Sequence, residues 1–401
     1  MKASLLRKSA NVGGLVFAVS AALTSFATGA VAAGGVTREG NLTKFTLPAV
    51  NSASGAGIDY KNAKPMPLPR VSVLAGSSAN AATFAHPGPA GSVSGHQGSG
   101  QVKPTVLIPE SELLNLIGAA STDDEIVPQE YGTSNHPFTT SRVDTALYPV
   151  SRAYPYRPAG KLFFNTPNGP SWCSASLIKR GVVVTAAHCV TKYGGSLPRF
   201  YTNFQFVPAF ANGVAPYGTW TASNVYVMTS YYNGADSCAV AGVVCQNDIA
   251  VIKLAPQAKY NPPYPGTATG WYGYGWNGYG FTPGNVAQIT QLGYPKTHDG
   301  GNLEQRTESY GITNAAFSSN TIIGSRQTGG SSGGPWAVNL GVTAVLNGTG
   351  YGSEAALSTV VGATSWGYVS TLPKEQGASP FLSTNIVPLV NAACSGFAGC
   401  L

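Results

Sequence analysis

The feature that most constrains this fold is a series of short apolar or alternating runs that begins near Tyr131. Glycine, proline or asparagine separates each run from the next, a pattern typical of short antiparallel strands in a barrel or a sandwich. The runs that we expect to form strands are 161–164, 172–178, 182–185, 203–207, 249–254, 287–292, 336–338, 342–346 and 364–369. One helix is expected over 385–393, with Pro388 in its first turn.

Residues 1–32 have the form of a signal peptide. Three basic residues near the start precede an apolar stretch over 12–23, and Ala30-Val31-Ala32 offers a small-residue cleavage signal. A membrane anchor is the alternative, but serines and threonines interrupt the stretch before it reaches the roughly 18–20 residues that a spanning helix needs. We therefore expect an exported protein that is extracellular or periplasmic and that does not stay in the membrane after cleavage.

All six cysteines lie after residue 172, which in an exported chain predicts three disulfides. Their spacing favours three local pairs: Cys173–Cys189, Cys238–Cys245 and Cys394–Cys400. A metal site is the alternative. No cysteine pair has the two-residue spacing of a zinc knuckle, and among the histidines only His188 lies near a cysteine. We expect no metal and no cofactor.

Composition divides the exported part of the chain in two. Residues 33–130 are rich in alanine, serine, glycine and proline, and contain no cysteine or tryptophan. Within them we expect one short helix at 111–117, followed by an acidic run at 123–125. A largely irregular pro-region over 33–130 before a domain over 131–401 is the main interpretation, and a disordered stalk is the alternative.

The charge content excludes some classes of partner. Lys and Arg exceed Asp and Glu by 23 to 16, but only 10% of residues are charged, against about 25% in an ordinary soluble chain. The basic residues are also scattered along the sequence. This pattern indicates neither a polybasic nucleic-acid arm nor a disordered polyelectrolyte.

Two motifs place a histidine and an aspartate, residue types that can act together in acid–base catalysis, at the ends of apolar strands. His188 lies in the sequence TAAHC directly after the run 182–185, where a tight turn would present its imidazole. Asp248 heads the apolar strand in NDIAVIKL. Such an aspartate can simply cap a strand, or it can accept the Nδ1–H of a histidine and fix the tautomer that base catalysis needs.

A third motif, GGSSGGP over 329–335, brackets Ser332 with glycines. Glycines on both sides let the backbone turn tightly, so that neighbouring N–H groups can point at one spot, as an oxyanion hole requires. As a plain Gly/Ser loop the segment would mean little. Its significance comes from occurring together with the other two motifs.

The three motifs, in the order His188, Asp248, Ser332, resemble those of the chymotrypsin-fold (trypsin-like) serine endopeptidases. YPYR at 154–157, LGYP at 292–295 and the Thr-Gly-Gly of 328–330 are similar to the secreted bacterial glutamyl-endopeptidase branch. The resemblance covers about residues 131–401. It implies two antiparallel β-barrels with the active site between them, a short C-terminal helix, protein or peptide substrates, a zymogen and a monomer.

The resemblance also implies roles for individual residues. Ser332 would be the nucleophile, His188 the general base and then the general acid, and Asp248 the residue that orients the imidazole. The backbone N–H groups of Gly330 and Ser332 would hold the oxyanion. The strand Ser365-Trp366-Gly367 would pair with the substrate backbone.

The sequence departs from the family pattern around the specificity pocket. Ser331 stands where animal members carry the aspartate of their activation ion pair, so zymogen control must come from elsewhere. Counting back from Ser332 places Arg326 and Gln327 at the base of the pocket, and Thr364 replaces the histidine of glutamate-selective relatives. Selectivity for acidic residues would need Arg326 in the pocket. If Arg326 is only a surface residue, we expect a broad preference for uncharged residues.

An exported, catalytically inactive binding module is the alternative from a different class. The aromatic stretch over 267–276 supports it, because clustered tryptophan and tyrosine rings can stack on sugars or other polymers. Such clusters more often line a loop, and the three complete catalytic motifs favour the enzyme.

Overall fold

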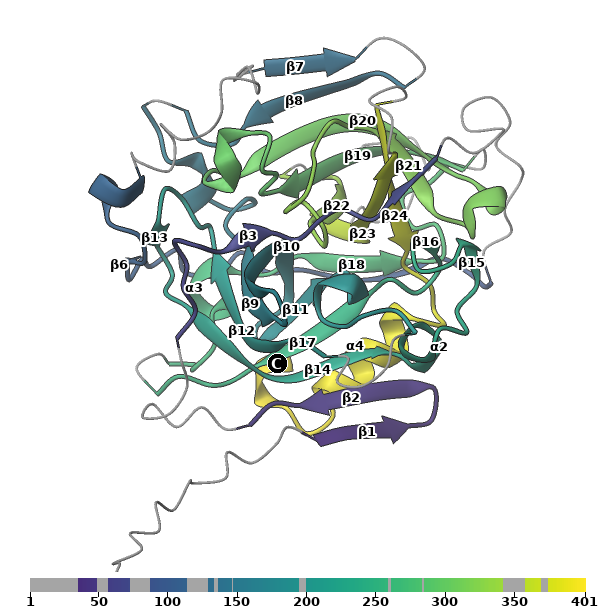
Figure 1. The fold of residues 1–401 in the computed structure, drawn as a ribbon, viewed down its shortest axis with the longest axis horizontal. Helices are drawn as coiled ribbons and strands as arrows, with labels where there is room; N and C mark the ends of the chain where they lie inside the picture. Colours follow the sequence, from purple (N-terminus) through teal and green to yellow (C-terminus); the bar gives the residue numbers. More distant parts are fainter. Residues whose placement is uncertain are drawn as a thin grey trace, which may run out of the picture.

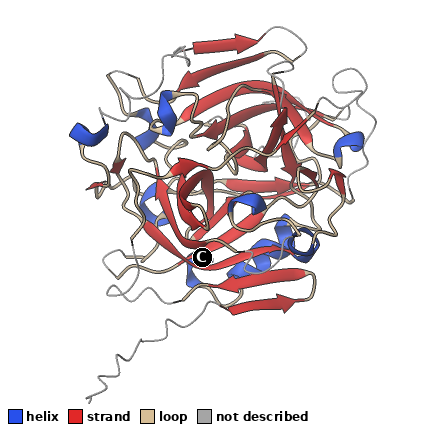
Figure 2. Cartoon of the chain, viewed as in Figure 1, coloured by secondary structure: helices blue, strands red, loops and turns tan. Residues whose placement is uncertain are grey.

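The structure, a computed structural model, describes the following residues: 35–48, 57–72, 87–113, 129–132, 136–145, 147–194, 200–258, 261–282, 285–341, 358–368 and 374–401. The expected signal peptide, the acidic run at 123–125 and the expected strand at 342–346 lie outside these residues. Strands are the main regular secondary structure of the described chain, with a few short helices (Figure 2).

Six antiparallel strands close into a first barrel (Figure 1). Their order is β14-β12-β9-β10-β11-β17, and pairing of β14 with β17 completes the ring. Gly169, at a φ of 111°, starts β10 directly after the turn from β9. The strands are β9 (Ala159–Thr166), β10 (Gly169–Lys179), β11 (Val182–Thr185), β12 (Thr202–Pro208), β14 (Trp220–Met228) and β17 (Ala250–Leu254).

A second set of six strands forms the other barrel. Here the order is β19-β22-β23-β24-β21-β20, closed by pairing between β19 and β20. The two closed sets of strands confirm the expected architecture of two antiparallel barrels. The chain runs through the first barrel before the second. The strands are β19 (Val286–Gly293), β20 (Gln305–Thr313), β21 (Thr321–Gly324), β22 (Pro335–Val338), β23 (Thr359–Tyr368) and β24 (Glu375–Pro380).

The expected C-terminal helix is present as α4 (Ile386–Cys394). The Asn385 side chain caps it by accepting a hydrogen bond from the N–H of Ile386, and Pro388 lies in the first turn, where its missing N–H leaves no intrahelical bond unmade. The helix buries its apolar face against β14 and β17 of the first barrel. None of the helices in the described ranges is both long and apolar enough to cross a membrane.

Three disulfides lock local loops, and the described chain has no free cysteine. Each joins residues that are close in sequence, so that each fixes one turn rather than linking the barrels. The pairs are Cys173–Cys189, Cys238–Cys245 and Cys394–Cys400.

The residues before 130 pack on both barrels. The hairpin β1 (Gly35–Glu39) and β2 (Leu42–Thr46) extends the first barrel's sheet, because β2 pairs with β14 and buries Leu42 and Phe45 (Figure 1). The remaining strands of this region are short and are separated by irregular chain. They are β3 (Lys64–Pro65) on β10, β4 (Arg70–Val71) on β23, β5 (Gly91–Val93) on β18 (Gly273–Trp276), and β6 (Thr105–Val106) on β13 (Val214–Ala215).

Lys161 is a lysine that is buried in the interior of the protein. It lies on β9 and is 3% exposed, with its Nζ donating to the carbonyl oxygen of Gly301 at 2.9 Å. The same nitrogen lies 4.0 Å from the ring centroid of Trp172 and 4.7 Å from that of Phe210. Removal from water disfavours the charged form, and this burial lowers the pKa of Lys161 to about 7.

This pKa predicts a pH-dependent stability. An unfolded lysine titrates near 10.4, so between about pH 7 and pH 10 the unfolded chain binds more protons than the folded one and stability rises with pH. Relative to a Lys161→Met variant, the parent protein should gain about 2 to 3 kcal/mol of unfolding free energy between pH 6 and pH 9. Urea unfolding of both proteins across this pH range measures this. Parallel pH profiles would contradict a pKa near 7.

Candidate active site

A short turn after β11 presents His188. The strand ends at Thr185, and the 3-10 turn η2 (Ala187–Cys189) follows at once. The disulfide between Cys173 and Cys189 ties this turn to β10. His188 is 7% exposed, so the imidazole is held in a buried, fixed position.

Asp248, which lies just before β17, binds His188 at two points. One carboxylate oxygen accepts the backbone N–H of His188 at 2.8 Å and the other contacts Nδ1 of its ring at 2.7 Å. The second oxygen also accepts a hydrogen bond from Ser365 Oγ at 2.6 Å. Burial by itself would raise the pKa of Asp248, but attraction to His188 and these hydrogen bonds outweigh it and hold the pKa below its ordinary value. The carboxylate therefore stays ionised next to the imidazole.

The loop that carries Ser332 packs against the strand that leads into His188. Gly333 has a φ of 78°, and a Cβ there would lie 2.0 Å from Thr185 Oγ1 and 2.8 Å from the backbone nitrogen of Ala186. The backbone N–H of Ser174 donates to the Ser332 carbonyl at 2.8 Å. Because Gly333 permits this close approach, the serine loop of one barrel is fixed against the histidine turn of the other.

Ser332 Oγ and His188 Nε2 are buried and have no hydrogen-bond partner within the described chain, and Gln327 Oε1 nearby is a third such atom. Leaving a buried polar atom unpaired costs about 1–3 kcal/mol, so each such atom calls for an explanation. With Nδ1–H directed at Asp248, Nε2 is the acceptor nitrogen of the ring. The site thus keeps a hydroxyl and a proton acceptor unsatisfied in neighbouring loops.

The adjacent serine is engaged elsewhere. Ser331 Oγ donates to the carbonyl oxygen of Thr328 at 2.7 Å, within the same loop. This bond stabilises the turn that precedes Ser332. Of the two serines in the motif, only Ser332 has an uncommitted hydroxyl.

The residues expected to bind substrate divide between surface and interior. Arg326 is exposed. Gln327 is 2% exposed, and its Nε2 donates to Thr307 Oγ1 at 3.0 Å. The indole of Trp366 is fully buried and donates to Asn320 Oδ1 at 2.8 Å. The Trp366 side chain therefore supports the strand and does not face solvent.

Sequence reasoning did not find the polar network beneath this region. Gln291 Nε2 donates to Gln376 Oε1 at 2.6 Å and to Thr364 Oγ1 at 2.9 Å. Ser325 Oγ donates to Gln291 Oε1 at 2.7 Å. These residues come from four separate segments and none belongs to a short motif, so no local signal could have revealed the network. The side chains that form it are uncharged.

Two groups in the described chain could resemble metal sites by composition. One is Cys173, His188 and Cys189, and the other is Asp236, Cys238 and Cys245. In each group the two cysteines are joined in a disulfide, so they offer no thiolate. One ligand remains in each, which is too few to hold an ion.

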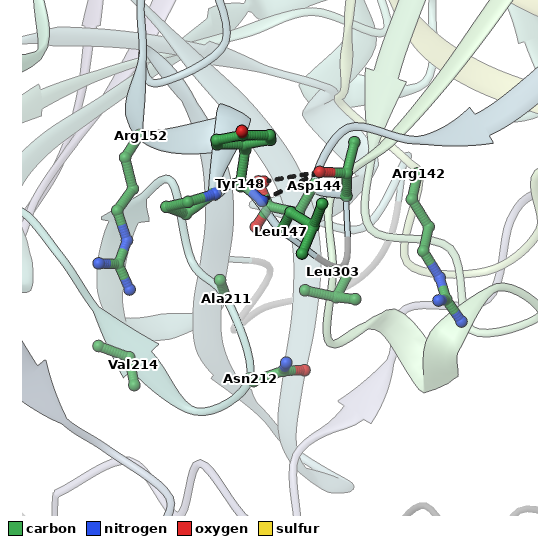
Figure 3. Close-up of a pocket in the computed structure, with 11 residues that line it drawn as sticks. Arg142, Asp144, Leu147, Tyr148, Arg152, Ala211, Asn212, Val214 and Leu303 are labelled. Atoms are coloured by element: carbon green, nitrogen blue, oxygen red, sulfur yellow. Dashed lines mark hydrogen bonds between the residues drawn. The ribbon is translucent and has the colours of Figure 1, made fainter.

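A pocket of about 430 Å³ lies away from these residues and includes none of them (Figure 3). Arg142 and Arg152 stand at opposite sides of it, and hydrogen bonds between Tyr148 and Thr145 shape one wall. Arg142 is committed to Asp299 in a two-point ion pair. The residues that line the pocket include no serine, cysteine or histidine.

Two closed antiparallel barrels, with an Asp–His pair on one and a glycine-flanked serine on the other, define a chymotrypsin-type serine protease. The family model named Trypsin matches residues 154–385, which is more than half of the chain and includes all three motifs. The chain belongs to the trypsin family. It is a serine endopeptidase, a hydrolase that acts on peptide bonds.

Solved structures of serine proteases resemble it in part. A thermostable serine protease, AL20, from an extremophilic microorganism is 24% identical with a TM-score of 0.47, over 60% of this chain and 98% of that chain. The protease Anisep from Arthrobacter nicotinovorans is 26% identical with a TM-score of 0.46, over 60% and 96%. A Glu endopeptidase solved with MPD is 20% identical with a TM-score of 0.45, over 64% and 96%. No curated protein matches the chain in sequence.

Proposed function

We propose that the protein cleaves peptide bonds through an acyl-enzyme on Ser332. His188 Nε2 takes the proton of the Ser332 hydroxyl as its oxygen attacks the scissile carbonyl carbon, and Asp248 stabilises the resulting imidazolium. The backbone N–H groups of Gly330 and Ser332 stabilise the oxyanion. His188 then protonates the leaving nitrogen, and a water molecule, activated by the same imidazole, hydrolyses the ester.

The observation that carries this proposal is that an unsatisfied serine hydroxyl and the unsatisfied nitrogen of a fixed imidazole lie in loops packed against each other. Asp248 holds His188 at two points, which leaves Nε2 as the acceptor, and Gly333 brings the Ser332 loop onto the histidine strand. Serine is a weak nucleophile without such a base.

The inactive binding module has less support. The aromatic stretch over 267–276 packs inward at Tyr272 and Tyr274, which are 0% and 5% exposed, and Trp271 stacks on His96. Rings engaged in this way offer no continuous platform for a sugar or polymer. A fluorophosphonate probe, which modifies only an activated serine, separates the two functions. Labelling of Ser332 supports the enzyme, and absence of labelling in the processed protein supports the binding module.

We infer that the chain is exported by its N-terminal signal peptide, that residues 33–130 form a pro-region, and that the protein acts extracellularly or in the periplasm as a monomer. The mature protein should then begin between about Thr122 and Val143. The three disulfides support an oxidising compartment. N-terminal sequencing of the secreted, active protein tests this prediction. An active species that begins at Ala33 would instead mean that residues 33–130 are a retained stalk.

We further propose that the specificity pocket favours uncharged residues. The exposed position of Arg326 and the neutral network around Gln327 support this, because a charged substrate side chain would lose its hydration there without gaining an opposite charge. Arg326→Ala should therefore change the ratio of kcat/KM for paired Glu and Leu substrates by less than about twofold. Arg152→Ala, another exposed arginine, is the matched control.

Two results would contradict this view of the pocket. Selective loss of cleavage after Glu in the Arg326→Ala variant would show that Arg326 recognises acidic side chains. Efficient cleavage after Lys or Arg by the unaltered enzyme would require a buried acid and would overturn the assignment of the pocket residues.

A further inference from the structure

Residues 64–71, which we call the crossing segment, run from the first barrel to the second beside the candidate active site. The sequence is Lys-Pro-Met-Pro-Leu-Pro-Arg-Val. At its start β3 pairs with β10 (Figure 1), and at its end β4 pairs with β23, in both cases in parallel. The segment therefore bridges the two barrels next to the loop that carries Ser332 and the strand that carries Ser365.

Three backbone hydrogen bonds hold the crossing segment in place. The N–H of Met66 donates to the carbonyl oxygen of Trp172 at 2.8 Å. The N–H of Gly330 donates to the Met66 carbonyl at 3.0 Å, and the N–H of Gly367 donates to the Pro69 carbonyl at 2.9 Å. Gly330 is the proposed oxyanion donor and Gly367 belongs to the strand expected to bind substrate. The crossing segment itself occupies the backbone N–H groups of both glycines.

Its side chains add apolar contacts. Leu68 is 7% exposed, and its Cδ2 lies 2.9 Å from where a Cβ on Gly367 would be, with Gln376 Cγ on the same side at 3.8 Å. Val71 packs in a cluster with Trp366. With the segment in place Ser332 is 0% exposed. A substrate could not reach the hydroxyl without displacing it.

We propose that the crossing segment is a built-in inhibitor, which occupies the substrate-binding site with its chain parallel to β23. This inference rests on the proposed function, because it assigns a regulator to the same site. Between the contacts at Gly330 and Gly367 the inhibitor runs from Met66 to Pro69, in its N-to-C direction. A peptide bound antiparallel to β23 would present the opposite polarity to Ser332.

The sequence also explains why the enzyme would not cleave such an inhibitor. The carbonyl held by Gly330 belongs to the bond between Met66 and Pro67. The nitrogen of that bond is in the proline ring, where Cδ replaces the amide hydrogen and crowds the space beside it. The bond nearest Ser332 is thus a poor substrate. The alternating prolines also restrict the unbound segment, which lowers the entropy cost of binding.

A synthetic peptide of residues 62–72 tests the proposal in trans on the processed enzyme. It should inhibit competitively and be recovered intact, and a fluorescent copy should bind by anisotropy, a readout that needs no catalysis. The peptide with the reversed sequence is the control for chain direction and should bind at least tenfold more weakly. Equal binding of the two peptides, or rapid cleavage at Met66–Pro67, would overturn the proposal.

The full-length chain provides a second test. Leu68→Asp places a carboxylate in a buried apolar position and should release the segment. We expect fluorophosphonate labelling of the full-length band at least tenfold faster than in the unaltered full-length chain. Val106→Asp, the same kind of change on exposed β6, should leave the rate unchanged. If all three chains label at one rate and the peptide does not bind, the proposal is wrong. If the peptide binds but the processed enzyme is never labelled, the catalytic proposal fails instead, and the docking of the segment stands.

Discussion

Replacing Ser332 with alanine is expected to lower the rate of peptide hydrolysis by about 10⁵- to 10⁶-fold, because the acyl-enzyme cannot form without its oxygen. Fluorophosphonate labelling should disappear as well. The hydroxyl makes no hydrogen bond in the structure, so its removal breaks no bond and the fold should be unaffected. Casein hydrolysis and the circular dichroism of the processed proteins measure both results.

Ser331→Ala is the matched control for this prediction. It removes the bond from Ser331 Oγ to the Thr328 carbonyl, so it should loosen the turn before the nucleophile and still leave measurable activity. A Ser332→Ala protein that hydrolyses casein at a near-normal rate would show that another residue is the nucleophile. Loss of all activity in Ser331→Ala with full activity in Ser332→Ala would move the assignment to Ser331.

Several apolar strands of the fold could be predicted from the sequence, but other strands, including the mostly polar β20, could not. The expected strand at 182–185 matches β11, because its valines form an uninterrupted buried run. In contrast β20 was not predicted. Its sequence, QRTESYGIT, has alternating buried and partly exposed positions, but mostly polar side chains fill the buried ones. They are tolerated there because partners from other strands satisfy them, as when Thr140 Oγ1 and Thr307 Oγ1 bond at 2.7 Å.

The candidate site also divides into features that a local sequence pattern reveals and features that depend on tertiary packing. The motifs around His188, Asp248 and Ser332 could be recognised locally because each combines a reactive side chain with a strand end or flanking glycines. The contact between Ser365 and Asp248 could not, since it joins residues that only the closed barrels bring together. The position of Arg326 also depended on tertiary packing, because counting along a sequence gives an alignment but does not decide between surface and interior.

The part of the chain before residue 130 was the least predictable. Its composition indicated irregular chain, and most of its strands are too short to leave a periodic pattern. They form because finished barrels offer edges to pair with, as β4 does on β23. The crossing segment shows this dependence most clearly: its prolines disfavour a strand, yet β10 and β23 hold it extended. Structure of this kind is imposed by the partner surface.

Asp248→Asn is expected to lower kcat/KM by about 10⁴-fold with little change in the fold. The carboxylate accepts hydrogen bonds from the His188 backbone N–H and from Ser365 Oγ, and it contacts Nδ1 of the imidazole. An asparagine would keep one oxygen and present an NH₂ group in place of the other. If the NH₂ faces Nδ1, the ring must accept there and carry its proton on Nε2, where it can no longer take the proton of Ser332.

Asp248 acts through His188, so the loss should fall on the chemical step. We expect kcat and the rate of fluorophosphonate labelling to drop together, while KM for a peptide substrate stays within a few-fold of the original. Ser365→Ala is the control, because it removes one hydrogen bond to the carboxylate but keeps its charge and its contact with Nδ1. It should cost far less, on the order of tenfold or below, as expected for one hydrogen bond to a charged group. An Asp248→Asn enzyme with near-normal kcat would mean that His188 takes its orientation from the fold alone, through the η2 turn and its disulfide.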